Sequence, residues 1–251
     1  MDPIRINEVT KRYPNGVTAL TELSMTVSRG EVFGFLGPNG AGKTTTIKLL
    51  LGFMAPDGGS VEVCGEDPRR PETRARLGYL PEVAYYYEFL TAEELLRFYG
   101  QINGLSPSAI HERTDYLLEL VGLRDVRRRL LREFSKGMRQ RIGVAQALLH
   151  NPDILILDEP MTGLDPLGRL QMRDIIVGLR AEGKTVFFSS HELSEAELIC
   201  DRVGILKAGR LCWTGAMRDL AGDGRGNLER VFLSKIGATG APEGVKSCPP
   251  V

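Results

Sequence analysis

The sequence lacks any apolar run long enough to form a membrane-spanning helix, which takes roughly 18 to 20 residues. Its first residues also lack the basic start, apolar stretch and small-residue cleavage site that are typical of a secretion signal. We therefore expect a soluble protein that stays inside the cell. If the protein acts on a membrane, a separate polypeptide must supply the membrane-spanning part.

Cysteine, histidine and net charge are also scarce. The 251 residues include 4 cysteines and 3 histidines, without Cys-x-x-Cys pairs or ligand spacing, which argues against a zinc site or a disulfide framework and for a reduced compartment. The 32 basic and 32 acidic residues balance, so no general positive field favours nucleic acid. We interpret the short basic run at residues 127–129 as a solvated helix end.

What the sequence does contain is a glycine-rich segment of the form G-x-x-x-x-G-K-[ST]. An apolar, β-rich stretch at residues 31–36 precedes it, and a helical pattern at 44–51 follows it. In this context the glycines allow backbone N–H groups to close on phosphate oxygens, and the helix N-terminus favours negative charge. The predicted nucleotide-binding residues are Gly37, Pro38, Asn39, Gly40, Ala41, Gly42, Lys43, Thr44 and Thr45.

Within this loop two side chains have predicted roles of their own. Lys43 is expected to reach the β- and γ-phosphates of a nucleoside triphosphate, and Thr44 to offer its hydroxyl to Mg²⁺.

The order of predicted elements indicates an α/β fold. Residues 4–33 favour β-structure with turns, 83–150 favour helices, and strands then alternate with helices up to residue 215. Such alternation predicts a mostly parallel sheet covered on both faces. We therefore predict a phosphate-loop NTPase core with an antiparallel β subdomain at the N-terminus and an inserted all-helical subdomain.

The predicted boundaries follow from the same pattern. One domain spans residues 1–236, with its core at about 1–82 and 151–215 and the helical subdomain at about 83–150. A last helix is expected at about 227–235, and the Gly- and Pro-rich stretch 237–251 is predicted to be disordered.

A second half of the site is predicted where the apolar run 154–157 ends in Asp158 and Glu159. Ligands of open parallel sheets bind at the carboxyl ends of strands, so both carboxylates should lie near the glycine-rich loop. We expect Asp158 to hold Mg²⁺, directly or through water. Glu159 is expected to polarise the water that attacks the γ-phosphate, because a carboxylate can act as a general base.

With these motifs the sequence resembles the nucleotide-binding domain of ABC transporters over about residues 4–233. The family commonly has Leu-Ser-Gly-Gly-Gln at the start of a helix, and this chain has Phe134-Ser135-Lys136-Gly137-Met138 at that place. The resemblance implies that Ser135, Lys136 and Gly137 contact ATP bound by a second subunit. A helix N-terminus suits that role, because it attracts anions.

Three further positions carry roles that the resemblance implies. Asp165, after Gly163 and Leu164, would contact the other subunit of a dimer. His191 would sense the γ-phosphate and act with Glu159 in catalysis. Tyr13 would stack on adenine, although an ordinary tyrosine beside a turn is the alternative interpretation.

Two departures from the family pattern qualify the resemblance. Glu82 stands where the family usually has a glutamine that contacts Mg²⁺, and it adds negative charge beside the two carboxylates. Lys136 and Met138 replace a glycine and a glutamine. The Lys-Gly-Met variant is similar to ABC-2 type exporters of drugs, antibiotics, lipids or polysaccharides.

The function implied by this resemblance is ATP hydrolysis that powers a separate transmembrane permease from the cytoplasmic face of the membrane. Two nucleotide-binding subunits, as a homodimer, would hold ATP and Mg²⁺ between them, and no nucleic acid would be involved. The alternative is a soluble ABC-type ATPase that acts on DNA or ribosomes. The aromatic-rich stretch 83–89 is expected either to dock the permease or to pack the helical subdomain.

Overall fold

The computed structural model describes residues 2–221, with side chains up to Asp219. Its N-terminal part is an antiparallel sheet in the order β2-β1-β4. The strands are β1 (Ile4–Arg12), β2 (Thr18–Val27) and β4 (Gly58–Val63). Alternate residues of β1 and β2 are buried, which gives this sheet one apolar face.

The second sheet has six strands in the order β5-β6-β7-β3-β8-β9. All neighbouring pairs are parallel except β8–β9, which form an antiparallel hairpin. The strands are β3 (Val32–Leu36), β5 (Leu77–Leu80), β6 (Ile154–Asp158), β7 (Thr185–Ser190), β8 (Arg202–Lys207) and β9 (Arg210–Ala216). The predicted α/β fold with a mostly parallel sheet and an antiparallel N-terminal sheet is confirmed.

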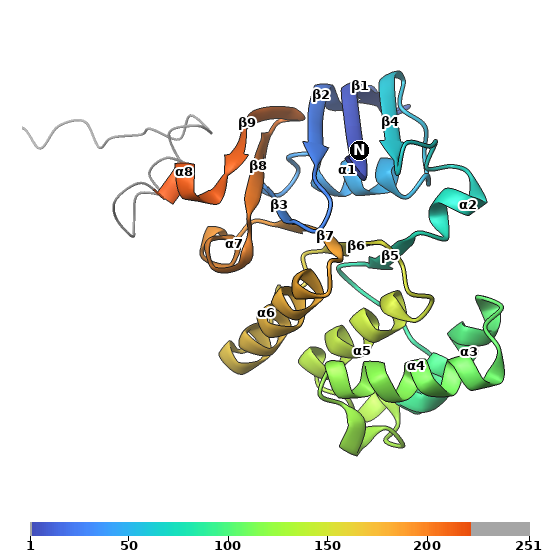
Figure 1. Cartoon of the computed structure of the whole chain (residues 1–251). Helices are drawn as coiled ribbons and strands as arrows, with labels where there is room; N and C mark the ends of the chain where they lie inside the picture. Colours follow the sequence, from blue (N-terminus) through green and yellow to red (C-terminus); the bar gives the residue numbers. More distant parts are fainter. Residues whose placement is uncertain (1, 222–251) are drawn as a thin grey trace, which may run out of the picture.

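Helices connect these strands. The helices of the core are α1 (Lys43–Leu50), α2 (Pro71–Arg74), α6 (Pro166–Ala181), α7 (Leu193–Ile199) and α8 (Met217–Ala221). Residues 83–150 form α3 (Ala92–Ile102), α4 (Pro107–Leu120), α5 (Lys136–Leu148) and two 3₁₀ turns, η1 (Arg124–Val126) and η2 (Leu131–Glu133). Figure 1 shows α3, α4 and α5 gathered on the side of the molecule opposite the antiparallel sheet.

Side-chain caps fix the starts of the three long helices of residues 83–150. Thr91 and Glu94 form a capping box that satisfies two backbone N–H groups at the start of α3. Ser106 caps α4, and its Pro107 occupies the first helical turn, where the missing N–H has no partner to lose. Ser135 caps α5 by accepting a hydrogen bond from the Met138 N–H.

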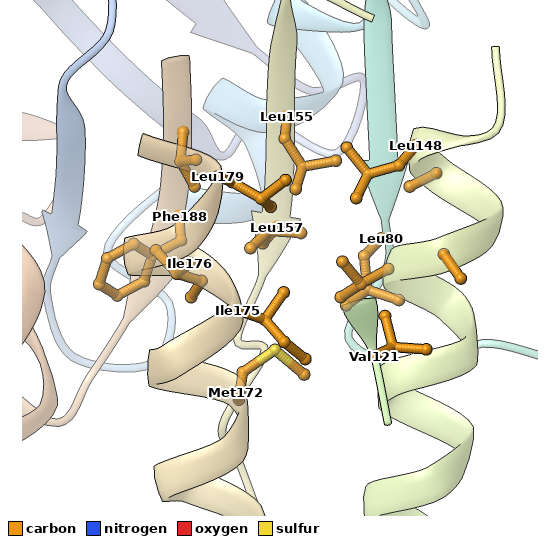
Figure 2. Close-up of a cluster of buried hydrophobic side chains, with 14 of the residues drawn as sticks. Leu80, Val121, Leu148, Leu155, Leu157, Met172, Ile175, Ile176, Leu179 and Phe188 are labelled. Carbon is orange, nitrogen blue, oxygen red and sulfur yellow. The ribbon is translucent and has the colours of Figure 1, made fainter. Parts of the chain in front are cut away.

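Strand β6 separates two hydrophobic cores, and its residues alternate between them. Leu155 and Leu157 face the core formed with α5 and α6, whereas Ile154 and Ile156 face the core under the antiparallel sheet. Figure 2 shows the first core, in which side chains of α6 meet the leucines of β6. Since both faces are buried, every residue of β6 is apolar until the strand reaches Asp158.

Two detailed predictions can be made more specific. The stretch 83–89 is expected either to dock the permease or to pack the helical subdomain, and Tyr86 does the second: it packs against the core of the helical region, with its hydroxyl end next to Gly143. The run at residues 127–129 follows the end of η1, and Arg128 and Arg129 are exposed, as predicted for a solvated helix end. Arg127 differs, because it is half-buried and forms ion pairs with Glu93 and Asp115.

The predicted helix at 227–235 and tail at 237–251 lie outside the described residues. Among residues 2–221 no helix is long and apolar enough to span a bilayer.

Candidate active site

The glycine-rich loop joins β3 to α1, and close packing requires its glycines. A Cβ atom on Gly37 would collide with the carbonyl oxygen of Leu206, and one on Gly42 would lie 2.7 Å from the carbonyl oxygen of Ala19. Gly42 also has a φ of 111°, a conformation that L-residues with side chains rarely adopt. The loop thus leads its backbone directly into the N-terminus of α1, where an anion is favoured.

Lys43, the first residue of α1, is buried and folds back over the loop. Its Nζ donates to the Gly37 carbonyl oxygen at 2.7 Å and lies 3.2 Å from Oε1 of Glu159. The low dielectric of the site strengthens the attraction of this ammonium group for phosphate.

At the carboxyl end of β6, Asp158 is held in place by the neighbouring strand. Ser189 of β7 donates its hydroxyl to Oδ1 of Asp158 at 2.6 Å and accepts the Glu159 N–H at 2.9 Å. Burial raises the pKa of Asp158 above its usual value, and the nearby charge of Glu159 adds to this, while hydrogen bonds from Ser189 and Thr44 and the charge of Lys43 oppose it. A cation here would offset the cost of burying this carboxylate.

Glu159 has a left-handed backbone conformation, with a φ of 49°, which turns its side chain from the strand into the site. Its carboxylate meets three groups there. Oε2 lies 2.8 Å from Nδ1 of His191 and accepts the Thr162 hydroxyl at 3.0 Å, and Oε1 faces Lys43. The carboxylate is buried and fixed, as a group that must orient one water molecule should be.

Residues 39–45 of the loop and Glu159 line one open cavity of about 540 Å³, and Asp158 lies behind its wall, hydrogen-bonded by Thr44. Its walls include Thr44, Thr45, Lys43, Glu159, His191 and the predicted but divergent Glu82. The hydroxyl of Tyr13 lies 3.2 Å from Oγ1 of Thr45, which places Tyr13 beside the loop. The predicted residues of the loop, the double acid and the histidine are thus brought together.

Ser135, Lys136 and Gly137 are not in this cavity. They lie at the N-terminus of α5, where Ser135 and Lys136 are exposed. The Lys136 amine occupies the position that a Cβ on Gly163 would take, so the loop 163–165 and the start of α5 pack against each other within one chain. Asp165 caps α6 by accepting the Gly168 N–H at 2.8 Å.

Two residues of the site escaped the sequence analysis. Ser189 connects Asp158 to Glu159, and Thr162 holds Glu159. Ser189 stands near the end of β7, so the strand-end rule that placed Asp158 and Glu159 could have found it. Thr162 follows a turn after Pro160, and no pattern in the sequence marks it.

Comparison with known proteins agrees with this geometry. The family described as ABC transporter matches residues 20–162, more than half of the chain. The chain belongs to the ABC transporter family. It is an ATP-binding subunit of that family, whose members are ATPases that power transport together with transmembrane partners.

Curated ABC relatives share much of the sequence. An uncharacterized ABC transporter ATP-binding protein of Synechocystis sp. is 45% identical over 237 residues, which cover 89% of this chain and 67% of that protein. The bacitracin transport ATP-binding protein BcrA of Bacillus licheniformis is 44% identical, over 83% of this chain and 68% of that protein. NatA of Bacillus subtilis is 37% identical, over 93% of this chain and 98% of that protein.

Solved ABC structures have the same fold. The ATP-binding subunit of an ABC transporter superimposes with a TM-score of 0.81 at 33% identity, over 92% of this chain and 98% of the other. CbiO1 of Clostridium perfringens, described as part of the transporter complex cbiONQ, gives a TM-score of 0.82 at 26% identity, over 94% and 96% of the two chains.

Proposed function

We propose that this chain hydrolyses ATP in a head-to-tail dimer with a second copy and thereby drives a separate permease that exports its substrate. One observation carries the catalytic part of this proposal. The carboxylate of Glu159 is fixed by His191, Thr162 and Lys43 in the same cavity as the glycine-rich loop.

Each residue then has a defined task in hydrolysis. The loop 37–45 binds the phosphates through backbone N–H groups, and Lys43 supplies positive charge to the β- and γ-phosphates. Glu159 accepts a proton from the attacking water and orients it toward the γ-phosphorus. His191 contacts the terminal phosphate while holding Glu159, so it links the presence of that phosphate to the position of the base.

The donor set also fits Mg²⁺ bound together with the nucleotide. Thr44 and Asp158 provide a hydroxyl and a carboxylate, and Glu82 is a further oxygen donor on the same cavity. In the described part of the chain no cluster of three or more acidic, histidine or cysteine side chains could hold a metal alone, which suits an ion that takes most ligands from phosphates and water. When bound, Mg²⁺ neutralises charge on the phosphate oxygens.

The second copy would complete the site. In our proposal Ser135, Lys136 and Gly137 of one chain contact the γ-phosphate held by the other, and Asp165 lies at the contact between them. Exposure of the α5 N-terminus supports this arrangement, because it leaves the N–H groups of the first turn accessible to an anion. Tyr13, beside the loop, would stack on adenine.

We place the permease contact on an aromatic surface formed by Tyr85, Tyr87 and Phe89 together with Phe98 of α3. Tyr85 is 90% exposed and Phe89 is 70% exposed, and Tyr87 contacts both Phe89 and Phe98. Exposed aromatic clusters are enriched at protein interfaces. Glu88 in the same segment pairs with Arg139 of α5 at 3.0 Å, which would transmit movement of the permease to the start of α5.

The direction of transport is inferred from relatives. Among them are a bacitracin transport protein and a Nod factor export protein, the latter 41% identical over 86% of this chain. This similarity and the Lys136-Gly137-Met138 variant favour export, with the chain on the cytoplasmic face of the membrane.

The test is to capture the dimer together with its partner. A tagged Glu159→Gln variant should trap ATP, and it should be purified from detergent-solubilised membranes with ATP and Mg²⁺. The matched control is the double variant Lys43→Ala/Glu159→Gln. It lacks the lysine that binds the phosphates, so it should not form the ATP-bound dimer. Recovery of an integral membrane protein with the first variant supports the proposal, whereas recovery of only ribosomes or DNA contradicts it.

A further inference from the structure

Arg169, in the first turn of α6, connects two segments that both carry proposed site residues. Its Nε donates to the carbonyl oxygen of Leu164 at 3.2 Å, next to Asp165. Its two Nη atoms donate to the carboxylate of Glu192, the residue after His191, and Nη2 does so at 3.3 Å. A third acceptor, Oε1 of Glu195, lies 3.5 Å from Nη1.

The segment that carries His191 has few other restraints. His191 follows the end of β7, and Glu192 caps α7 without a side-chain cap bond. Ser190 and Glu192 hydrogen-bond each other across His191, which shapes the turn without connecting it to the rest of the protein. Three contacts tie this turn to other elements: the Gly37 N–H donates to the Ser190 carbonyl oxygen at 3.1 Å, His191 bonds to Glu159, and Arg169 pairs with Glu192. Of these, the Arg169–Glu192 pair is the one that reaches the loop at residues 163–165.

The guanidinium suits this position because it is planar and carries several donors in fixed directions. It satisfies a backbone carbonyl on one side and a carboxylate on the other at the same time. A displacement of Leu164 and Asp165 therefore shifts the arginine, and the arginine shifts Glu192 and its neighbour His191.

We propose that Arg169 is a positioning residue that transmits contact between the two subunits from the loop at residues 163–165 to His191. This inference rests on the proposed dimer and on the proposed role of His191. In the assembled dimer Asp165 faces the second chain, so arrival of that chain fixes the loop, and through Arg169 it holds the histidine against Glu159.

The neighbouring Arg173 offers a matched control. It lies one turn further along α6 and pairs with Oε2 of Glu195 at 3.6 Å rather than with Leu164 or Glu192. Both arginines are partly buried, with side-chain exposures of 30% and 23%. The Arg169–Glu192 pair is partly exposed on both sides, and such pairs add little to stability. Glu195 is buried, but each arginine lies near it, so one remains when the other is replaced, and neither Arg169→Ala nor Arg173→Ala should unfold the chain.

The experiment measures ATPase activity against protein concentration, with Mg²⁺ and ATP, for wild type, Arg169→Ala, Arg169→Lys, Arg173→Ala and His191→Ala. A displaced catalytic group lowers turnover without weakening substrate binding, and a shift of about 1 Å can cost on the order of 100-fold. We expect Arg169→Ala to lower the plateau rate at least about tenfold, with the concentration midpoint and KM for ATP unchanged.

Arg169→Lys should recover only part of the rate, because one ammonium cannot hold both acceptors in the same geometry. It also replaces Arg169→Ala as the test if the alanine variant does not fold. Arg173→Ala should stay within about twofold of wild type.

Equal losses in Arg169→Ala and Arg173→Ala, or a plateau within about twofold of wild type in Arg169→Ala, would overturn the inference. The His191→Ala variant distinguishes failure of the inference about Arg169 from failure of the proposed function. If His191→Ala is inactive while Arg169→Ala is active, only the positioning role is wrong; if both are active, the role of His191 is wrong as well.

Discussion

The carboxyl end of β6 and the N-terminus of α5 both contribute to the proposed ATP site, and they are built very differently. At the end of β6, Asp158 and Glu159 are buried and bonded to Ser189, Thr162 and His191. At the start of α5, Ser135 and Lys136 are exposed, and Ser135 caps its own helix.

This difference separates the chemistry into two steps. The end of β6 holds its groups in place before any nucleotide arrives, so binding needs little rearrangement there. At the start of α5, the N–H groups and the Ser135 hydroxyl can contact a γ-phosphate only when a second chain brings its bound ATP to them. Substitutions at the end of β6 should therefore lower the rate of hydrolysis at any protein concentration. Substitutions at the start of α5 should lower only the rate of the assembled dimer.

The largest expected effect comes from the first region. Glu159→Gln keeps the shape of the side chain but removes the base, so kcat should fall by about 10²- to 10⁴-fold. Binding of ATP to the isolated chain should persist, because the glycine-rich loop and Lys43 are unchanged. Steady-state phosphate release and equilibrium binding of a fluorescent ATP analogue measure the two quantities, and a parallel loss of both would contradict the role of a base.

The second effect concerns the α5 N-terminus. Ser135→Ala removes both a helix cap and a proposed phosphate contact, and the cap alone is worth about 1 kcal/mol. We expect about a tenfold lower kcat with unchanged ATP affinity of the dilute chain. Ser106→Ala, which removes the equivalent cap of α4, is the control for stability alone. An equal loss of activity in both variants would remove the distinction between the regions.

The third effect concerns coupling to the permease. Tyr85→Ala and Phe89→Ala should leave the ATPase rate of the isolated chain unchanged and reduce transport in reconstituted vesicles about tenfold or more, since aromatic residues dominate interface energies. Tyr86→Ala should instead lower stability by about 3 kcal/mol, because its ring packs in the core. Transport that survives both exposed substitutions would locate the permease contact elsewhere.

The smallest effect is on stability and follows from the raised pKa of Asp158. A carboxyl whose pKa is higher in the folded state contributes stability below its unfolded pKa, and this is lost as the pH rises through the folded value. At pH 7 the buried charge thus costs stability, and Asp158→Asn should raise the Tm of the nucleotide-free chain. A gain of 1 kcal/mol corresponds to roughly 2–4 °C at this size.

Calorimetry at pH 7 without nucleotide measures this gain, and repeating the scan at pH 4 should show a smaller one. A lower Tm for Asp158→Asn at pH 7 would mean that Lys43 and Ser189 already outweigh the cost of burial. Hydrolysis should be lost in either case, if Asp158 holds the metal.

Much of this architecture was accessible from local sequence patterns. The start of α3 is encoded in Thr91 and Glu94, and the apolar run 154–157 is long enough to identify a strand buried on both faces. Contacts between distant segments were not accessible. Tyr86 and Tyr87 are neighbours of the same type, yet one packs over Gly143 and the other is exposed, and only the position of α5 decides which.

The same limit applies to the site. Asp158 and Glu159 could be placed because strand ends in a parallel sheet converge, and His191 through the resemblance to the family. Thr162 and Arg169 could not, because their importance depends on how the chain turns after Pro160 and on where α7 packs against α6.

Strand β6, shared by both cores, has a consequence for amide hydrogen exchange. Its backbone is bonded to β5 and β7 and covered on both faces, so its amides should exchange only when the whole domain opens. Asp158 is the last residue of this strand and Glu159 follows it. A nucleotide bound there therefore adds its binding free energy to the free energy of that opening. Protection should therefore increase at Leu155 and Ile156, well before the strand reaches the site.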